Sequence, residues 1–226
     1  MSPLNGFPNN FQIRPTHDAR LAAERINFLK LALIFQGSLL LLAMVIGWCL
    51  GQPVWTKLRL TFEGLGWGVA ATIPMLVFLV VVYRSRARNL IQIRDLLNET
   101  LGGPLSACGW LDLSGLALLA GVSEECLFRG VLEPLLSRWG PFYGLIACNV
   151  LFGICHAVTP TYAVIAGLMG VYLSLTLRLT SEPNLIIPIA CHSLYDLVAF
   201  VVVRNSFRRD QEEDPHDQDF LSAESQ

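Results

Sequence analysis

Six ionisable residues lie inside stretches that are otherwise apolar enough to sit in lipid. They are Glu124, Glu125, Arg129, His156, His192 and Asp196. An ionisable side chain at the centre of a membrane helix costs roughly 2.5–3.5 kcal/mol on insertion scales, so such residues normally face one another or water. Their clustering in the C-terminal half predicts a polar reaction chamber inside a helical bundle.

The acidic residues of the first cluster have different expected roles. Glu125 and Arg129 are four residues apart and share a helix face, as do Arg129 and Glu133, which predicts a structural ladder Glu125–Arg129–Glu133. Glu124 faces another direction on a helix of 3.6 residues per turn. It is therefore the candidate general base. Alternatively, all of these charges only link helices.

The histidines also stand at helical spacings from a second functional group. Phe152 and His156 share a face, and His192 and Asp196 repeat the four-residue spacing, so that Asp196 can accept from one imidazole nitrogen and fix its tautomer. Glu124 could then deprotonate a water held by His156, while His192 and position 196 donate to an oxyanion. The same four side chains could instead hold Zn²⁺, and the residues alone leave both arrangements open.

The rest of the chain predicts an all-α, polytopic transmembrane bundle. Of its 226 residues, 53% are hydrophobic and only 15% are charged, against about a quarter charged in soluble domains. Six spans are expected, near residues 29–51, 64–83, 109–136, 141–158, 161–179 and 184–203. Between the second and third, Leu90, Ile93 and Leu97 recur at helical spacing, which indicates an amphipathic interfacial helix or a plain connecting helix.

These spans divide the chain into three parts. We expect a flexible tail at 1–27, a transmembrane bundle at 28–205 and an acidic, disordered tail at 206–226. Lys and Arg concentrate in both tails and in the loop after the second span, so the positive-inside rule predicts that both termini are cytoplasmic. The expected location is the cell membrane, with several passes, and a bacterial plasma membrane is the expected setting.

Three motifs resemble those of the CPBP family, which comprises CAAX prenyl-protein endopeptidases and bacterial Abi-type membrane proteins. The family's Glu-Glu-xxx-Arg motif resembles Glu124 to Arg129, its Phe-xxx-His motif resembles Phe152 to His156, and its His-xxx-Asn motif resembles His192 to Asp196. The similarity covers roughly residues 108–200.

The resemblance implies an intramembrane endopeptidase that hydrolyses a membrane-associated or lipidated, CAAX-like peptide. By that resemblance Glu124 and His156 activate water, and His192 with position 196 forms the oxyanion hole. Glu125, Arg129 and Phe152 would be supporting residues. The family's Asn is replaced by Asp196, and an ionised carboxylate accepts hydrogen bonds but cannot donate them.

The expected partners are membrane lipid and a membrane-bound or lipidated substrate, and the net charge of −2 gives no indication of nucleic-acid binding. No cofactor is expected, although a Zn²⁺-dependent form of the same protease would use Glu124, His156, His192 and Asp196. Two other classes remain as alternatives. One is a non-proteolytic scaffold or bacteriocin-immunity-type protein, and the other is a proton-coupled transporter.

Overall fold

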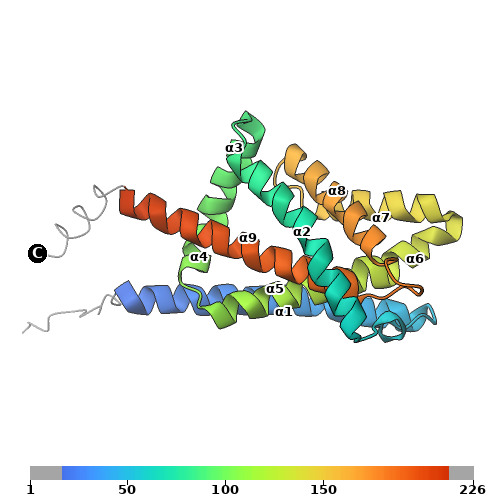
Figure 1. Ribbon diagram of the computed structural model, residues 1–226. Coiled ribbons are helices and arrows are strands. Elements are labelled where there is room, and N and C mark those ends of the chain that lie inside the picture. The colour runs from blue at the N-terminus through green and yellow to red at the C-terminus, as the bar shows by residue number, and fades with distance from the viewer. Residues whose placement is uncertain (1–16, 214–226) are drawn as a thin grey trace, which may run out of the picture.

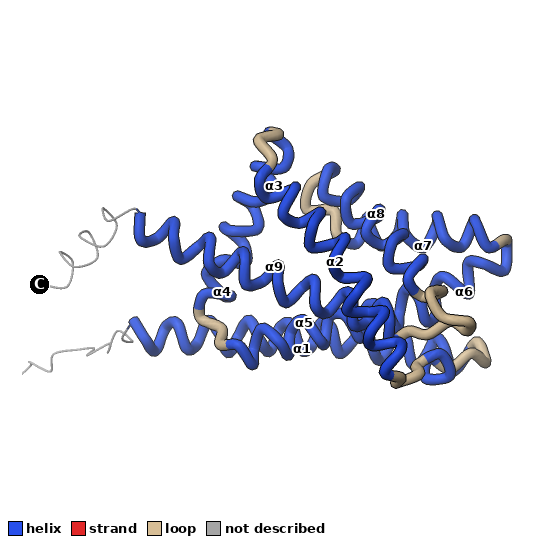
Figure 2. The backbone as a smooth tube through the Cα atoms, in the orientation of Figure 1, coloured by secondary structure: helices blue, strands red, loops and turns tan. Residues whose placement is uncertain are grey.

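The computed structural model describes residues 17–213, with side chains described for residues 22–212. Every regular element in this part of the chain is helical, as the all-α prediction required (Figure 2). The α-helices are α1 (His17–Cys49), α2 (Phe62–Arg84), α3 (Arg88–Leu97), α4 (Gly103–Ser106), α5 (Trp110–Leu127), α6 (Glu133–Leu136), α7 (Pro141–Cys155), α8 (Pro160–Thr176) and α9 (Ile186–Glu213). Short 3-10 or π turns are η1 (Val54–Lys57), η2 (Asn98–Gly102), η3 (Phe128–Leu132) and η4 (Ser137–Trp139).

Helix α9 is the centre of the bundle. It packs against α2 on one side and α5 on the other, while α1 packs along α5 and α7 pairs with α8 (Figure 1). The described start of α1 and the described end of α9 lie at the same end of the molecule (Figure 1). The two helices that carry the Glu124–Glu125 pair and the His192–Asp196 pair, α5 and α9, are therefore direct neighbours.

Three helices are long and apolar enough to cross a membrane. These segments are Ala22–Cys49, Phe62–Arg84 and Ile186–Glu212. They coincide with the first, second and sixth expected spans. Helices α7 and α8 are apolar but shorter, with 15 and 17 residues, and the third expected span is made of α5, η3 and α6, which together contain the charged cluster. The membrane character of the bundle thus rests on α1, α2 and α9.

The first helix starts earlier than the expected tail boundary. Residues 1–16 of that tail lie outside the described part, but residues 17–27, which we expected to be flexible, form the first turns of α1. This segment is rich in Ala, Leu, Arg and Glu, all strong helix formers. Arg25 also anchors it, because its Nε and Nη2 atoms donate to the Asp112 carboxylate of α5, both at 2.8 Å.

The last helix likewise extends beyond the expected bundle. Residues 206–213 continue α9 where we expected a disordered tail, whereas the remainder of that tail lies outside the described residues. Contacts with η2 explain the extension. Asn98 Nδ2 donates to Ser206 Oγ at 3.1 Å and to Asp210 Oδ2 at 3.0 Å.

Helix α3 occupies the segment for which an amphipathic helix was expected. Its apolar face is turned towards the protein. Ile93 is buried, and Ile93 and Leu97 line an internal cavity together with residues of α2, α8 and α9. Helix α3 therefore forms part of a cavity wall.

A single glycine allows α5 and α9 to approach closely beside the charged cluster. A Cβ atom at Gly121 would lie 2.2 Å from Ser193 Oγ, 3.0 Å from Ser193 N and 3.1 Å from Ile189 O. Two of these atoms belong to the α9 backbone, which cannot rotate away as a side chain can. Close approach here places Glu124 and Glu125 on α5 opposite His192 on α9.

We expect Gly121→Ala to lower the free energy of unfolding by about 1–3 kcal/mol, the usual cost of overpacking a tight contact. Thermal unfolding in detergent measures the effect. Gly115→Ala is the matched control, because Gly115 is on the same helix and a Cβ there would meet nothing within 4 Å. Equal unfolding temperatures for the two variants would contradict the close-contact interpretation.

Candidate functional site

A π turn interrupts the helix directly after the glutamate pair. Helix α5 ends at Leu127, and Phe128–Leu132 form η3 before α6 resumes at Glu133. Pro134 has no backbone N–H, so the Gly130 carbonyl lacks its α-helical donor. Lys57 Nζ donates to this carbonyl at 3.1 Å. Burial lowers the pKa of Lys57 from its ordinary value, while the Glu133 carboxylate acts in the opposite direction.

Only the first half of the charge ladder that the sequence predicted is present. Arg129 Nη1 pairs with Glu125 Oε1 at 3.0 Å, as expected for the first half of the ladder. The second half is wrong, because Glu133 pairs instead with Arg178 Nη2 at 3.0 Å. The other donors of Arg129 are bonded to Asn149 and to the Gly170 carbonyl instead of to Glu133.

Arg129 connects three helices, α5, α7 and α8, from a fully buried position. Besides Glu125, its guanidinium donates to Asn149 Oδ1 of α7 at 3.0 Å and to the Gly170 carbonyl of α8 at 2.7 Å. Its Cζ atom lies 4.6 Å from the centroid of the Phe152 ring. A Cβ at Gly170 would approach Asn149 Oδ1 to 2.5 Å, so the glycine leaves room for this network. The sequence did not point to Asn149 because a lone Asn in an apolar stretch is compatible with many roles.

Glu125, and not Asp196, fixes the tautomer of His192. The Glu125 Oε1 atom lies 2.8 Å from His192 Nδ1, and a carboxylate oxygen accepts, so Nδ1 carries a proton. Our expectation that Asp196 would set the tautomer is therefore wrong. Asp196 Oδ2 lies 3.5 Å from Nε2, the other ring nitrogen. The reason is the close packing of α5 against α9, which brings a carboxylate from another helix nearer than the one on the same helix.

The orientation of His156 is set by its own helix. His156 Nδ1 donates to the Phe152 carbonyl at 2.8 Å, since a carbonyl oxygen can only accept. The neutral ring therefore has its lone pair on Nε2. The Phe152 and His156 rings are 4.4 Å apart between centroids, which confirms the predicted shared face.

The Nε2 atoms of both histidines are turned towards the same oxygen of Glu124. Glu124 Oε2 lies 3.6 Å from His156 Nε2 and 4.0 Å from His192 Nε2. These distances exceed those of direct hydrogen bonds. Glu124 Oε2 is buried and has no hydrogen-bond partner within the part of the chain that the structure describes. The structure thus brings together Glu124, His156, His192 and Asp196 from α5, the C-terminal end of α7 and α9.

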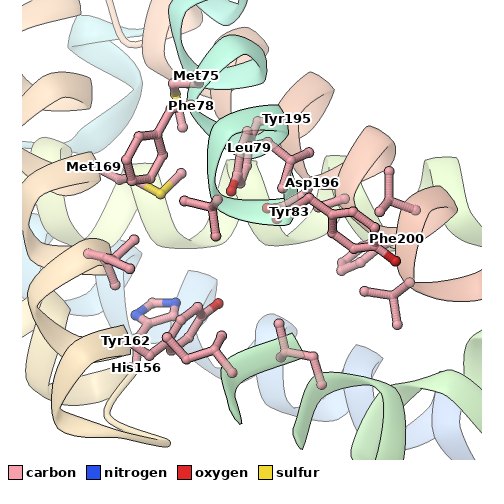
Figure 3. A pocket seen from close by; sticks show the side chains of 18 of the residues that line it. Met75, Phe78, Leu79, Tyr83, His156, Tyr162, Met169, Tyr195, Asp196 and Phe200 are labelled. Atoms are coloured by element: carbon pink, nitrogen blue, oxygen red, sulfur yellow. The ribbon is translucent and has the colours of Figure 1, made fainter. Parts of the chain in front are cut away.

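A cavity of about 170 Å³ lies beside this cluster. His156, His192 and Asp196 form part of its wall, and most of the remaining lining is apolar and comes from α2, α3, α8 and α9. Figure 3 shows Tyr162 beside His156, and Asp196 and Tyr195 across the opening. Tyr162 was not identified from the sequence, because a tyrosine in an apolar segment is typical of core packing. The cavity thus has a polar wall formed by His156, His192 and Asp196, and its other walls are mainly apolar.

The described residues contain no preformed metal site. In residues 17–213 there is no group of three or more His, Cys, Asp or Glu residues arranged to hold a metal ion. In tetrahedral Zn²⁺ sites, bonds of about 2.0–2.1 Å place neighbouring ligand atoms roughly 3.3 Å apart. The separation of 4.0 Å between Glu124 Oε2 and His192 Nε2 is wider. The Zn²⁺ ligand set considered from the sequence is therefore not preformed.

Together, the apolar helices and the internal polar cluster define a helical membrane protein with a buried hydrophilic site. Comparison with family models makes the assignment more specific. Residues 106–198 match the family described as type II CAAX prenyl endopeptidase Rce1-like. This segment is therefore similar to an Rce1-like domain, in agreement with the CPBP resemblance of its motifs.

The matched segment covers somewhat less than half of the chain and contains all six of the ionisable residues singled out above. It supports a CAAX-type protease at the level of the family. The comparisons with curated proteins and with solved structures gave no match.

Proposed function

We propose that this protein is an intramembrane endopeptidase that hydrolyses a peptide bond of a membrane-associated or lipidated, CAAX-like peptide. The observation that carries the proposal is the position of Glu124 Oε2. This atom has no hydrogen-bond partner in residues 17–213 and faces both histidine Nε2 atoms next to an apolar cavity. The family match of residues 106–198 supports the same reaction class.

In the proposed first step, a water molecule donates one hydrogen to Glu124 Oε2 and the other to His156 Nε2. Both atoms are acceptors when the carboxylate is ionised and the imidazole is neutral, and they are close enough to orient one water. Glu124 takes the first proton while the water oxygen attacks the peptide carbonyl carbon. The new C–O bond forms as negative charge develops on the carbonyl oxygen.

His192 is the proposed donor to this oxyanion. Its Nδ1 proton is bonded to Glu125, so a second proton on Nε2 makes an imidazolium that can donate into the site. Glu125 and Asp196 flank the ring and stabilise the positive charge. Asp196 thus supports His192 instead of donating directly as an amide would. The peptide C–N bond then breaks as Glu124 returns its proton to the leaving nitrogen.

The apolar lining of the cavity supports the proposal that the substrate is lipidated. Its lining is mainly aliphatic and aromatic, so it can cover an apolar chain while the scissile bond lies against His156 and His192. Ala199 of α9 lines the cavity, so we expect a larger side chain at this position to occupy part of it.

We expect the purified protein to cleave a farnesylated CAAX-type peptide and to cleave the same peptide without its lipid much more slowly. Mass spectrometry identifies the new carboxyl terminus, and a chelator should leave the rate unchanged. Loss of activity on chelation would favour the metal-dependent form. Absence of cleavage of either peptide would contradict the proposal.

Ala199→Phe should raise KM for the farnesylated peptide roughly tenfold, because the larger side chain would reduce the space for the lipid. Val81→Phe, at an exposed position of α2, is the matched control.

A further inference from the structure

Helix α1 carries one amide in the middle of an otherwise apolar segment. Gln36 follows Leu33, Ile34 and Phe35, whose side chains are all exposed, as expected for a helix surface in contact with lipid. An amide costs free energy in an apolar environment unless it is hydrogen-bonded. Polar residues within membrane segments therefore usually have a specific partner in the bundle.

Both ends of the Gln36 amide are hydrogen-bonded to α5. Its Nε2 atom donates to Glu124 Oε1 at 3.0 Å, and its Oε1 atom accepts from the Ser123 hydroxyl. The opposite orientation would place two oxygens, Gln36 Oε1 and Glu124 Oε1, against each other. The contacts therefore fix which end of the amide faces the carboxylate.

These bonds give the two oxygens of Glu124 different environments. Oε1 is held by Gln36, whereas Oε2 has no partner among the described residues and faces the histidines. Rotation of the carboxylate would break the bond to Gln36 and move Oε2 out of reach of His156. We propose that Gln36 is a positioning residue, whose amide holds one oxygen of Glu124 so that the other is aimed at the reacting water.

This inference rests on the proposed function and adds a residue from outside the matched family segment. Residues 106–198 contain the other members of the cluster, while Gln36 is contributed by the N-terminal helix. The site is thus completed only when α1 packs against α5.

Attachment of α1 to α5 does not depend on Gln36. Arg25 forms a two-bond pair with Asp112 near one end of the contact. Further along, Ala43 is fully buried in an apolar cluster against which Leu39 and Ile46 also pack. Removal of the amide should therefore leave the helix in place, which makes a catalytic test possible.

The test is Gln36→Met, which keeps the length of the side chain but removes both hydrogen bonds. With the farnesylated peptide we expect kcat to fall by roughly 10–100-fold, the effect of a hydrogen bond to a charged group, with KM within about twofold of the wild-type value. The thermal unfolding temperature should stay close to that of the wild type. Ser123→Ala removes the contact behind the amide, together with contacts to the Leu119 and Ala120 carbonyls of its own helix, and should lower kcat by a smaller factor.

Two comparisons separate positioning from a general structural role. In a Glu124→Gln background, Gln36→Met should cause no further loss of the residual activity, because the oriented base is already absent. Ser38→Ala is the matched control, since the Ser38 hydroxyl is bonded only to the Phe35 carbonyl of its own helix. This control should retain the wild-type kcat.

The possible results are distinguishable from failure of the proposed function. If the wild-type protein cleaves no peptide, the proposed function fails and this inference fails with it. If the wild type is active and Gln36→Met retains its kcat, loses activity only through KM, or unfolds at a clearly lower temperature, the positioning role is overturned while the protease proposal stands.

Discussion

Replacement of Glu124 by Gln is expected to lower kcat for peptide cleavage by about 10²–10⁴-fold, the range that a positioned general base contributes. The amide is nearly isosteric with the carboxylate but cannot take a proton from water. Because Glu124 makes no ion pair with Arg129, the variant should fold and accumulate in the membrane as the wild type does. The measurement is initial rate against concentration of the farnesylated peptide, together with the amount of folded protein.

Glu63→Gln provides the control for this variant, because Glu63 is exposed at the start of α2 and outside the cavity lining. It should cleave at the wild-type rate. A Glu124→Gln protein that also retains the full rate would reject the hydrolytic assignment. Survival of a biological activity in that variant, with loss in Arg129→Leu, is the behaviour expected of a non-proteolytic scaffold.

Arg129→Leu is expected to destabilise the protein by about 3–5 kcal/mol, the usual consequence of removing one partner from a buried ion pair. Arg129 and Glu125 are both fully buried, so the remaining carboxylate would lose its guanidinium partner without gaining water and would keep only His192. Asn149 and the Gly170 carbonyl would also lose a donor. Denaturant unfolding in detergent, combined with the yield of folded protein, measures this effect.

Arg59→Leu is the comparison for the Arg129 variant. Arg59 pairs with Glu182, and about half or more of each of the two side chains is exposed. Solvent-exposed pairs contribute about 0–1 kcal/mol, so this variant should unfold almost like the wild type. Similar losses in the two variants would mean that burial of Arg129 does not determine its contribution.

The motif spacings predicted much of the site because each four-residue pair lies on one regular helix. Phe152 and His156 share a face as expected, and Glu125 pairs with Arg129. The prediction failed for Glu133, where the helix is no longer regular. A single sequence does not reveal a π turn, since no residue type specifies it uniquely.

Contacts between helices were the second limit on prediction from sequence. That Glu125 reaches His192 depends on the close approach of α5 and α9 at Gly121, and the contact between Gln36 and Glu124 depends on the packing of α1. Neither pairing has a periodic signature, because the partners are 67 and 88 residues apart in the chain. The lone amide in an apolar run was the one available signal for Gln36.

The extra-wide turn at Phe128–Leu132 also determines how this region tolerates changes in length. A π turn holds one residue more than the corresponding α-helical turn, so deleting a residue there would rewind the segment into a continuous α-helix. Everything after the deletion would rotate by about 100° relative to Glu124 and Glu125. An insertion or deletion in this turn would therefore rotate the helix that follows it. Sequences of related chains should be aligned separately on the two sides of the turn.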